Sequence, residues 1–232
     1  MKRVAVLQSN YIPWKGYFDI IHDVDLFVFY DEVQYTKNDW RNRNQIQTDN
    51  GLKWLTIPCG YDTKRKIYEV KIKNEFHWQE EHYKTIRETY RKTPFFEKYQ
   101  EFLEYVYLDR HWEYLYELDR YMTETISKDF LGIQTEFRDS REFESHGAKD
   151  DKLLSLLRSI KCDTYISGPA AQAYMDVSRY TDCGINVVWK DYSGYPEYPQ
   201  RFEPFTHHVS ILDLLFNVGG DAPYYIWGWR EK

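Results

Sequence analysis

The polar run from Gln8 to Tyr17 is the first segment of this 232-residue chain whose side chains can do chemistry. It is rich in amides and aromatic rings, which hydrogen-bond to a ligand and stack on it. We expect its pocket-lining residues to be Gln8, Asn10, Tyr11, Trp14 and Tyr17. The run leads into a helix N-terminus, which favours an anion, and Gly16 leaves room for a ligand to approach closely. The structural alternative is that the aromatic residues only pack the helix onto a sheet.

A second candidate segment begins at Asp31, directly after an apolar run. Its carboxylate can bind magnesium, hold a sugar hydroxyl or act as a catalytic base. Three cations follow in an acidic chain, and we expect them to clamp a phosphate or carboxylate: Lys37, Arg41 and Arg43. The same segment adds further expected ligand contacts from Gln34, Tyr35, Trp40 and Asn42. A solvated basic surface is the alternative for the three cations.

Two later segments can complete the walls of the same site. One is the turn that contains Ser167 and Gly168, and the other contains Asp191, Tyr192 and Tyr195. His207 adjoins the start of the last helix and is a second candidate base beside Asp31. The histidines and cysteines lack metal-ligand spacing, and no nucleophile motif or Walker loop is present, so we predict no metal and leave the cofactor open.

These segments need a scaffold, and the first third of the chain predicts one. Residues 4–7 and 26–30 are continuous apolar runs typical of buried parallel strands. Pro13 is expected to open a helix that extends through Ile21, which gives a βαβ unit. The Asn50-Gly51 turn predicts a hairpin between residues 43–47 and 53–57, and residues 66–72 have the composition of another strand.

The middle of the chain has helical periodicity. Residues 78–90 repeat apolar positions every four residues, and a second helix is expected from Pro94, with Thr93 as its cap. Further apolar stripes continue until Gly132. We interpret residues 76–132 as a helical insertion.

The last third returns to alternating elements. Residues 153–160 and the segment from Pro169 through Met175 are predicted helices, and residues 164–166 and 185–189 are predicted strands. Ser210 with Asp213 has the form of a capping box before a final helix. The whole pattern predicts one α/β domain over residues 1–232, with a mainly parallel sheet whose ligands gather beyond the carboxyl ends of the strands.

Composition narrows the class of protein. The formal net charge of −6 argues against a general nucleic-acid binder, and no apolar run approaches the roughly 20 residues that a membrane helix needs. The N-terminus lacks a signal-peptide core, and the three cysteines show no pairing pattern, so we expect reduced thiols and a cytoplasmic protein. Aromatic residues reach 19%, with 22 tyrosines, which suits either a large aromatic core or a surface that stacks on flat or sugar-like ligands.

Three strings together resemble the WbqC-like protein family over nearly the whole chain. They are QSNYIPWKGYFDII with DLFVFYDEVQYTKNDWRNRNQI, then GLKWLTIPC, then YISGPAAQAYMD with DYSGYPEYPQ and SILDLLFNVG. The family occurs among bacterial genes for O-antigen and other surface polysaccharides. The resemblance therefore implies work on a sugar nucleotide or a related precursor.

A second resemblance concerns the layout of the first βαβ unit. A strand, then P-x-x-G-x-F into a helix, then a strand ending near Asp31 is similar to HIGH-motif nucleotidyltransferases and pantothenate-synthetase-type ligases. Their loop holds ATP phosphates. Here the HxGH positions read Trp14-Lys15-Gly16-Tyr17, so both histidines are missing. The Rossmann-like layout is expected to persist while the chemistry has changed.

Three hypotheses of function follow. The first is acyl or aminoacyl transfer onto an amino-sugar nucleotide, with a sugar nucleotide and an acyl donor as small-molecule partners. The second is an ATP-dependent ligase or nucleotidyltransferase. The third is a non-catalytic protein that binds a precursor or another enzyme, which an exposed aromatic patch without a concave site would favour. The donor, the acceptor and the oligomeric state are left open by the sequence.

Overall fold

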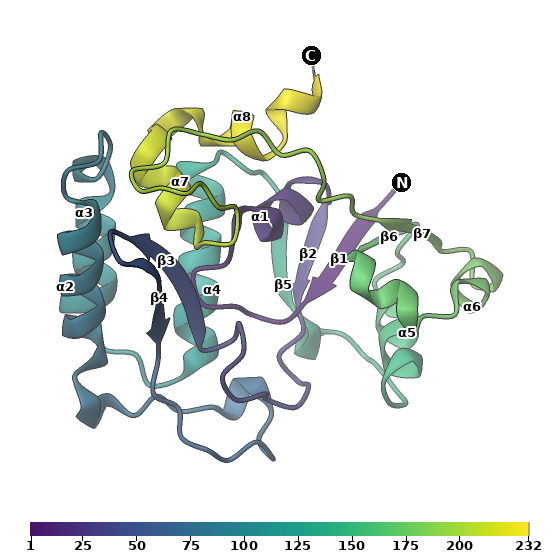
Figure 1. Cartoon of the computed structure of the whole chain (residues 1–232). Helices are drawn as coiled ribbons and strands as arrows, with labels where there is room; N and C mark the ends of the chain where they lie inside the picture. The colour runs from purple at the N-terminus through teal and green to yellow at the C-terminus, as the bar shows by residue number, and fades with distance from the viewer. Residues whose placement is uncertain (232) are drawn as a thin grey trace.

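Within residues 1–231, which the computed structural model describes, five parallel strands form a sheet in the order β5-β2-β1-β6-β7 (Figure 1). They are β1 (Arg3–Leu7), β2 (Leu26–Phe29), β5 (Glu136–Asp139), β6 (Thr164–Ser167) and β7 (Asn186–Trp189). The chain adds β2 and β5 on one side of β1 and then returns to add β6 and β7 on the other, which is a Rossmann-like order. The predicted α/β class with a mainly parallel sheet is confirmed.

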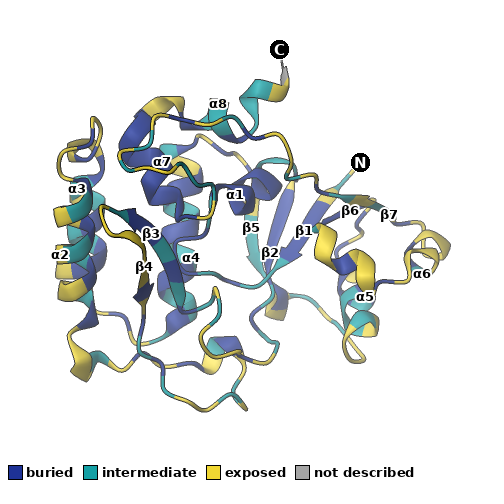
Figure 2. Cartoon of the chain, viewed as in Figure 1, coloured by how far each residue is buried: buried dark blue, intermediate teal, exposed yellow. Residues whose placement is uncertain are grey.

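Both faces of the sheet are covered, because alternate residues of each strand point to opposite sides. Ala5 and Phe27 belong to the core shared with α1 (Lys15–His22). Val6 and Val28 belong to a second core shared with α5 (Asp150–Ser159). Figure 2 shows β1 and β2 as buried strands at the centre of the molecule. Burial on both faces explains why these strands have continuous apolar sequences.

The sheet reverses its direction of winding between β1 and β6. These neighbours share only the pairs Arg3 with Thr164 and Val4 with Tyr165. By contrast, β1 stays paired with β2 as far as Leu7. The strands of a Rossmann-like sheet leave a crevice beyond their carboxyl ends where the strand order reverses, so this is where a ligand site is expected.

A hairpin and a helical layer lie between β2 and β5 in the chain. The predicted hairpin is confirmed as β3 (Arg43–Thr48) and β4 (Gly51–Thr56). The helices that follow are α2 (Trp78–Tyr90), α3 (Gln100–Glu104) and α4 (Leu115–Thr125), with π-helical turns at Tyr105–Asp109 and Ile126–Phe130. Figure 1 shows β4 between β3 and α2. The predicted stop at Gly132 is confirmed, since its φ of +69° is one that glycine adopts easily.

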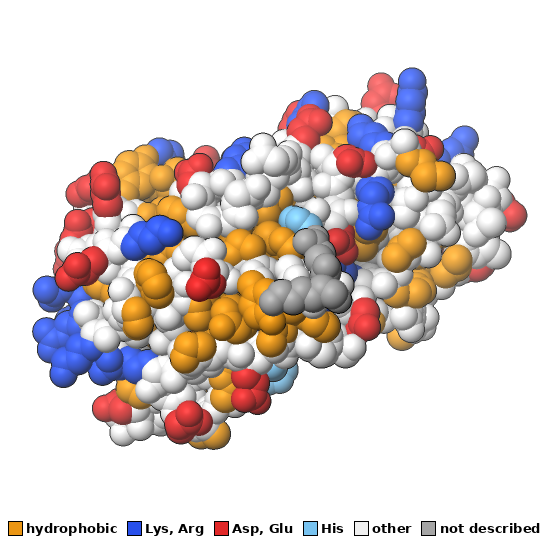
Figure 3. Space-filling model, turned by 90° about the horizontal axis from the view of Figure 1, so that it is seen from above, with side chains coloured by type: hydrophobic (Ala, Val, Ile, Leu, Met, Phe, Trp, Pro, Cys, Tyr) orange, Lys and Arg blue, Asp and Glu red, His pale blue; other side chains and the backbone are white. Residues whose placement is uncertain are grey.

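The C-terminal part adds α6 (Val177–Asp182), α7 (Ile211–Val218) and α8 (Ala222–Ile226). Short 3-10 helices form at Ile67–Glu69, Asn74–Phe76, Glu97–Tyr99, Ser140–Glu142, Pro169–Ala173, Gly219–Asp221 and Gly228–Glu231. Figure 3 views the side of the molecule that carries α8, where hydrophobic side chains form a band across the surface. Among the helices of residues 1–231, none is long and apolar enough to cross a membrane.

The expected helix start at Pro13 is wrong by two residues. Helix α1 begins at Lys15, with Trp14 in an extended conformation before it. The carbonyl of Pro13 accepts the backbone N–H of Ile211 at 2.9 Å, whereas Tyr17 donates to Trp14. A contact across nearly 200 residues therefore sets where the helix begins.

The expected strand over residues 66–72 is also wrong. Ile67–Glu69 forms a 3-10 turn, and the backbone N–H groups of Ile67 and Tyr68 donate to the carbonyls of Val33 and Asp31. This segment lines the irregular loop after β2, so its apolar residues are buried without a regular strand partner. The predicted helix from Pro169 through Met175 is only the short 3-10 helix Pro169–Ala173.

Two predicted caps need correction. Thr93 does not cap a helix at Pro94, because its hydroxyl donates to the carbonyl of Tyr90 and closes the end of α2. Ser210 does cap α7, where its hydroxyl accepts the N–H of Leu212. Asp213 takes no part in that cap, since its carboxylate accepts hydrogen bonds from distant tyrosines.

A buried carboxylate ties α1 to the C-terminal segments. Asp19 has no exposed surface and accepts from Lys190 at 2.7 Å, from the Tyr195 hydroxyl at 2.5 Å and from Arg230 at 2.8 Å. These donors come from the end of β7, the loop after it and the last 3-10 helix. Lys190 is itself 6% exposed, so its buried ammonium group needs the carboxylate of Asp19 as a counter-charge.

We therefore expect Asp19→Asn to lower the free energy of unfolding by about 3 kcal/mol, because it leaves a buried ammonium without a full counter-charge. Urea unfolding at neutral pH measures this. Asp23→Asn is the matched control: Asp23 also pairs with Lys190, but its side chain is 32% exposed, and we expect a smaller loss of about 1–2 kcal/mol. Equal losses in the two variants would contradict the assignment of Asp19 as the principal partner.

Candidate functional site

Asp31 joins three parts of the chain at the end of β2. Its buried carboxylate accepts the backbone N–H of Ser9 at 2.9 Å and the Ser9 hydroxyl at 2.6 Å. Arg120 of α4 donates to it through Nε at 2.8 Å, and Nη2 lies 2.7 Å from the same oxygen. The catalytic role expected for Asp31 stays a prediction, while its observed contacts hold the loop after β1.

The same guanidinium reaches the end of β5. Arg120 donates through Nη1 to Asp139 at 2.5 Å, and Arg141 donates to the same carboxylate. Burial raises the pKa of Asp139, but the hydrogen bonds from Arg141 and Arg120 outweigh it and lower the pKa to about 2. Asp139 therefore stays ionised, and Arg120 links β5 to β2.

The loop after β1 has a strained backbone conformation. Ile12 has φ of +35°, a region that β-branched residues rarely enter. Asn44 of β3 compensates by donating its amide to the carbonyls of Tyr11 and Ile12, at 3.1 and 2.9 Å. Tyr11 also donates its N–H to the carbonyl of Trp40 at 2.9 Å. Such strain persists only where surrounding bonds hold it, and it concentrates at functional sites.

A buried hydrogen-bond chain fixes the Tyr11 side chain. Its hydroxyl lies 2.8 Å from Nδ1 of His82 and 2.5 Å from the hydroxyl of Tyr107. Burial lowers the pKa of His82 to about 3, so the ring is neutral and can accept from Tyr11. Tyr11 is fully buried, which makes it a support of the loop rather than a wall of the pocket.

A cavity of about 230 Å³ lies beside this loop. Its lining comes from the loop after β1, the segment before β3 and the approach to α7: Asn10, Pro13, Trp14, Trp40, Asn44 and His208. Oδ1 of Asn10 is buried and has no hydrogen-bond partner among residues 1–231. The indoles of Trp14 and Trp40, the amide of Asn10 and the imidazole of His208 thus line one small cavity.

Trp14 folds back over the first turn of α1. A Cβ on Gly16 would lie 2.3 Å from the Trp14 ring, so glycine is required here. The room expected at Gly16 for a ligand is filled by this indole. The ring centroid of Trp14 also lies 5.3 Å from Tyr192 and 6.0 Å from Tyr195, which places the fourth predicted segment behind the cavity wall.

Lys15 is a buried cation that was not predicted from the sequence. It is 3% exposed, its Nζ lies 4.7 Å from the ring centroid of Tyr195, and its hydrogen bond to the carbonyl of Pro196 is 3.5 Å long. Burial lowers the pKa of Lys15 to about 7, although the charge of Asp19 opposes this. In the sequence, a lysine on the otherwise apolar face of α1 was the feature that could have indicated this buried cation.

The two neighbouring histidines have different surroundings. His207, the predicted base, packs against Phe205 and Tyr195, and its Nδ1 has no hydrogen-bond partner in the described part of the chain. Burial, followed by the charge of Lys15, lowers the pKa of His207 to about 4. His208 is the one that lines the cavity.

The basic segment after β2 is divided between the site and the surface. Arg41 pairs with Asp39 at 2.6 Å, and its Nε is buried without a hydrogen-bond partner within residues 1–231. Asn42 donates its amide to the carbonyl of Ile57. The guanidinium of Arg43 lies 4.2 Å from the ring centroid of Trp54 on the hairpin. The three cations expected to form one anion clamp therefore point to different partners.

Other predicted contacts lie away from the cavity lining. Gln34 donates to the carbonyl of Thr63, Tyr35 is 1% exposed, and Lys37 lies over the exposed ring of Tyr61.

The remaining predicted residues support the strand ends. The Tyr17 hydroxyl donates to the carbonyl of Gln8 at 2.8 Å, and both are outside the cavity lining. Ser167 is 4% exposed, and Asp191 accepts the N–H of Ser193. A Cβ on Gly168 would lie 3.9 Å from the Tyr192 hydroxyl, which is an ordinary contact distance. Whether these residues contact a ligand stays a prediction.

Asp119 is the most unusual group that was not predicted from the sequence. It has no exposed surface, and neither carboxylate oxygen has a hydrogen-bond partner among the described residues. Burial and the nearby charge of Asp31 raise the pKa of Asp119 well above its ordinary value, against the influence of Arg41 and Arg120. In the sequence, a carboxyl group within the apolar stripe of α4 was the feature that could have indicated this buried aspartate.

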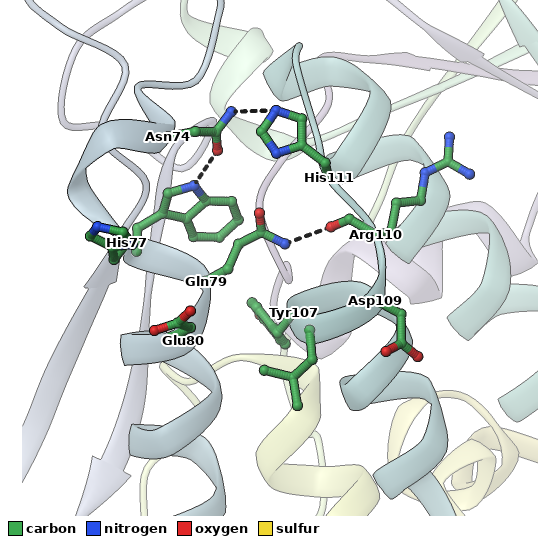
Figure 4. A pocket seen from close by; sticks show the side chains of 10 residues that line it. Asn74, His77, Gln79, Glu80, Tyr107, Asp109, Arg110 and His111 are labelled. Atoms are coloured by element: carbon green, nitrogen blue, oxygen red, sulfur yellow. Dashed lines mark hydrogen bonds between the residues drawn. The ribbon is translucent and has the colours of Figure 1, made fainter.

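A second cavity of about 300 Å³ opens at the N-terminal start of α2. Figure 4 shows Asn74 directed toward His111 and Gln79 directed toward Arg110. Asn74 accepts from Trp78 and donates to the carbonyl of Trp112, and Gln79 donates to the carbonyl of Arg110 at 2.8 Å. Because the amides of this cavity are already bonded within the protein, they offer fewer free groups than the cavity beside the loop after β1.

Comparison with known proteins identifies relatives of the chain. The model of the WbqC-like protein family matches residues 8–225, so the chain belongs to this family, as the three strings indicate. The uncharacterized protein Rv1507c of Mycobacterium tuberculosis is 41% identical over 228 residues, covering 97% of this chain and 98% of that protein. No solved structure matches the chain.

We predict that Gly16→Ala displaces the Trp14 indole, because the new methyl group overlaps it. Overpacking of this kind lowers the free energy of unfolding by about 1–3 kcal/mol. Chemical unfolding measures the loss, and the change in tryptophan fluorescence reports the ring. Gly168→Ala is the control, since its Cβ would have no heavy atom nearer than 3.9 Å. An unchanged Gly16→Ala protein would contradict the observed position of Trp14.

We predict that Asp119→Asn stabilises the fold increasingly as pH rises above about 4. A carboxyl whose pKa is raised in the folded state contributes stability below its unfolded pKa, and that stability is lost as pH rises through the folded pKa. Within this window wild type loses about 1.4 kcal/mol per pH unit relative to the variant. Urea unfolding of both proteins across this pH range measures the difference, and a difference that does not vary with pH would count against a protonated Asp119.

Proposed function

Because this chain belongs to the WbqC-like protein family and carries a two-tryptophan cavity at its strand ends, we propose that it binds an amino-sugar nucleotide and transfers an acyl or aminoacyl group to it. The cavity is the observation that carries the proposal. It lies on the carboxyl side of the sheet, where Rossmann-like proteins bind nucleotide ligands. The resemblance implies that the family occurs among surface-polysaccharide genes. This supports a sugar precursor as the substrate.

The size of the cavity suggests which part of the ligand enters it. Pockets that enclose drug-sized molecules measure roughly 300–1,000 Å³. A space of about 230 Å³ suits one sugar ring and not an entire sugar nucleotide. The sugar is therefore assigned to the cavity, and the nucleotide to the surface outside it.

The lining complements an amino sugar. Trp14 and Trp40 offer indole faces for the apolar side of the ring. The Asn10 amide lines the cavity and can exchange a hydrogen bond with an amino or hydroxyl group of the sugar.

His208 is the side chain placed to accept a proton in this cavity. In the proposed step the sugar amine attacks the acyl carbon, a C–N bond forms and the bond between the acyl carbon and its carrier breaks. His208 takes the proton that the nitrogen loses and returns it to the departing group, so that atoms and charge balance. His207, whose pKa is lowered to about 4, is neutral at neutral pH and adds no positive charge beside His208.

The geometry gives less support to the ATP-dependent alternative. In that mechanism the phosphates of ATP would approach Gly16 at the N-terminus of α1. The Trp14 indole occupies this space, since a Cβ there would already overlap it. An ATP complex would require Trp14 to move.

A thermal-shift panel tests the proposal with UDP- and dTDP-amino sugars, acyl-CoAs and ATP with magnesium. We expect an amino-sugar nucleotide to raise the melting temperature. Asn10→Ala should weaken its binding about tenfold through loss of one hydrogen bond, whereas Asn186→Ala, an exposed asparagine on β7, should leave it unchanged. A shift with ATP alone, or none with any sugar nucleotide, would reject the proposed substrate.

The role of His208 is tested separately from binding. His208→Ala should keep the thermal shift produced by the sugar nucleotide and lower kcat for acyl transfer by about a hundredfold or more, because general-base catalysis supplies roughly that factor. Transfer is measured by mass spectrometry of the acylated sugar. Full transfer activity in His208→Ala would exclude it as the base.

A further inference from the structure

The wall of the cavity formed by Trp40 continues onto the outer face of the hairpin. Trp40 and Trp54 are 48% and 40% exposed, and their ring centroids lie 5.7 Å apart. The guanidinium of Arg43 covers the Trp54 ring at 4.2 Å. Exposed indoles leave large apolar faces in water, so two of them in contact form a platform on which a ligand can stack.

Beyond Trp54 the surface sinks into a groove of about 660 Å³ between the hairpin and α2. Figure 1 shows β4 and α2 as neighbours on this side of the molecule. Strand β4 contributes Trp54, α2 contributes Thr85 and Thr89, and the loop before α7 contributes Phe202. The groove is nearly three times as large as the cavity beside Trp14, and the Trp40–Trp54 pair connects the two.

The chemistry of the groove indicates the class of ligand. Lys53 and Arg201 oppose Asp49 and Glu88, so these charges cancel and give no preference for a phosphate chain or a strongly basic partner. Around them are threonine hydroxyls and the Asn50 amide. The hydroxyls of Thr48 and Thr89 donate to the carbonyls of Gly51 and Thr85, and the Asn50 amide donates to Asp49, so these groups offer a ligand mainly their acceptor oxygens. Hydroxyls, amides and ion-forming side chains beside an exposed indole complement a neutral polyol with one apolar ring face.

We propose that a neutral carbohydrate chain binds across Trp40 and Trp54 and extends into the groove between β4 and α2. This inference rests on the proposed function in one respect, because it takes the cavity beside Asn10 as the subsite for the amino sugar. It extends the class of acceptor from a single amino-sugar nucleotide to an amino sugar at the end of a longer chain. The terminal ring occupies the cavity beside Asn10, and the following rings stack on the indole platform. The groove then supplies hydrogen bonds to hydroxyl groups along the chain.

Isothermal calorimetry of the full chain tests the inference with neutral gluco-, galacto- and manno-tetrasaccharides and the corresponding monosaccharides. We expect a tetrasaccharide to bind more tightly than its monosaccharide. Trp54→Ala should weaken that binding about threefold to tenfold, the effect of losing one stacked ring. Trp54→Phe should restore part of the affinity because it keeps an aromatic face.

Tyr174→Ala is the control for loss of an exposed aromatic residue, since Tyr174 is 75% exposed and lies outside the groove lining. It should bind the tetrasaccharide as wild type does. No gain of affinity from monosaccharide to tetrasaccharide, or equal affinity in Trp54→Ala, would overturn the inference. Binding of extended peptides or anionic chains, without binding of the tetrasaccharide, would also overturn the inference.

The two proposals fail in different experiments. Thr85→Ala should leave the thermal shift by an amino-sugar nucleotide intact, because Thr85 is a groove residue of α2 that does not line the cavity. Tetrasaccharide binding without any sugar-nucleotide shift would reject the transferase substrate while supporting the groove. A thermal shift with the sugar nucleotide, without tetrasaccharide binding, would support the transferase substrate and reject the carbohydrate chain in the groove.

Discussion

The guanidinium of Arg120 lies between the carboxylates of Asp31 and Asp139, and the geometry of the candidate site depends on this buried contact. It connects the carboxyl ends of β2 and β5 to α4, while Ser9 brings the loop after β1 to the same carboxylate. Removing one member of a buried ion network leaves the other charges desolvated, which is strongly destabilising. The loop can therefore hold the strained backbone of Ile12.

Beside this ion network, the surface of the candidate site is aromatic, and its two indoles are positioned by ring packing and by a backbone hydrogen bond. Trp14 is positioned by the absence of a side chain at Gly16, and Trp40 by the bond that its carbonyl accepts from Tyr11. Preorganised rings lose less conformational entropy when a ligand stacks on them. The arrangement changes from a small cavity at Asn10 to an open groove beyond Trp54, which suits a long ligand with one recognised end.

The errors in predicting the elements have a common origin. Pro13 has the right chemistry for a first helical residue, yet its carbonyl bonds to Ile211 and the helix begins later. Residues 66–72 have strand-like composition but face an irregular loop and not another strand. Strand β5 was not predicted, because Glu136–Asp139 contains mostly charged residues and gives no hydrophobic pattern. In each case a distant backbone partner decided the local conformation.

The sequence by itself determined the α/β class, the two central strands, the hairpin and the family, because these depend on apolar periodicity, turn chemistry and recurring strings. It also directed attention to the strand-end loops that contain Asn10, Trp14 and Trp40. Only the tertiary structure decided that His208 and not His207 lines the cavity, and that the carboxyl of Asp119 is buried without a hydrogen-bond partner among residues 1–231. Burial, proton affinity and shared cavities are properties of groups brought together from distant positions, so local pattern does not contain them.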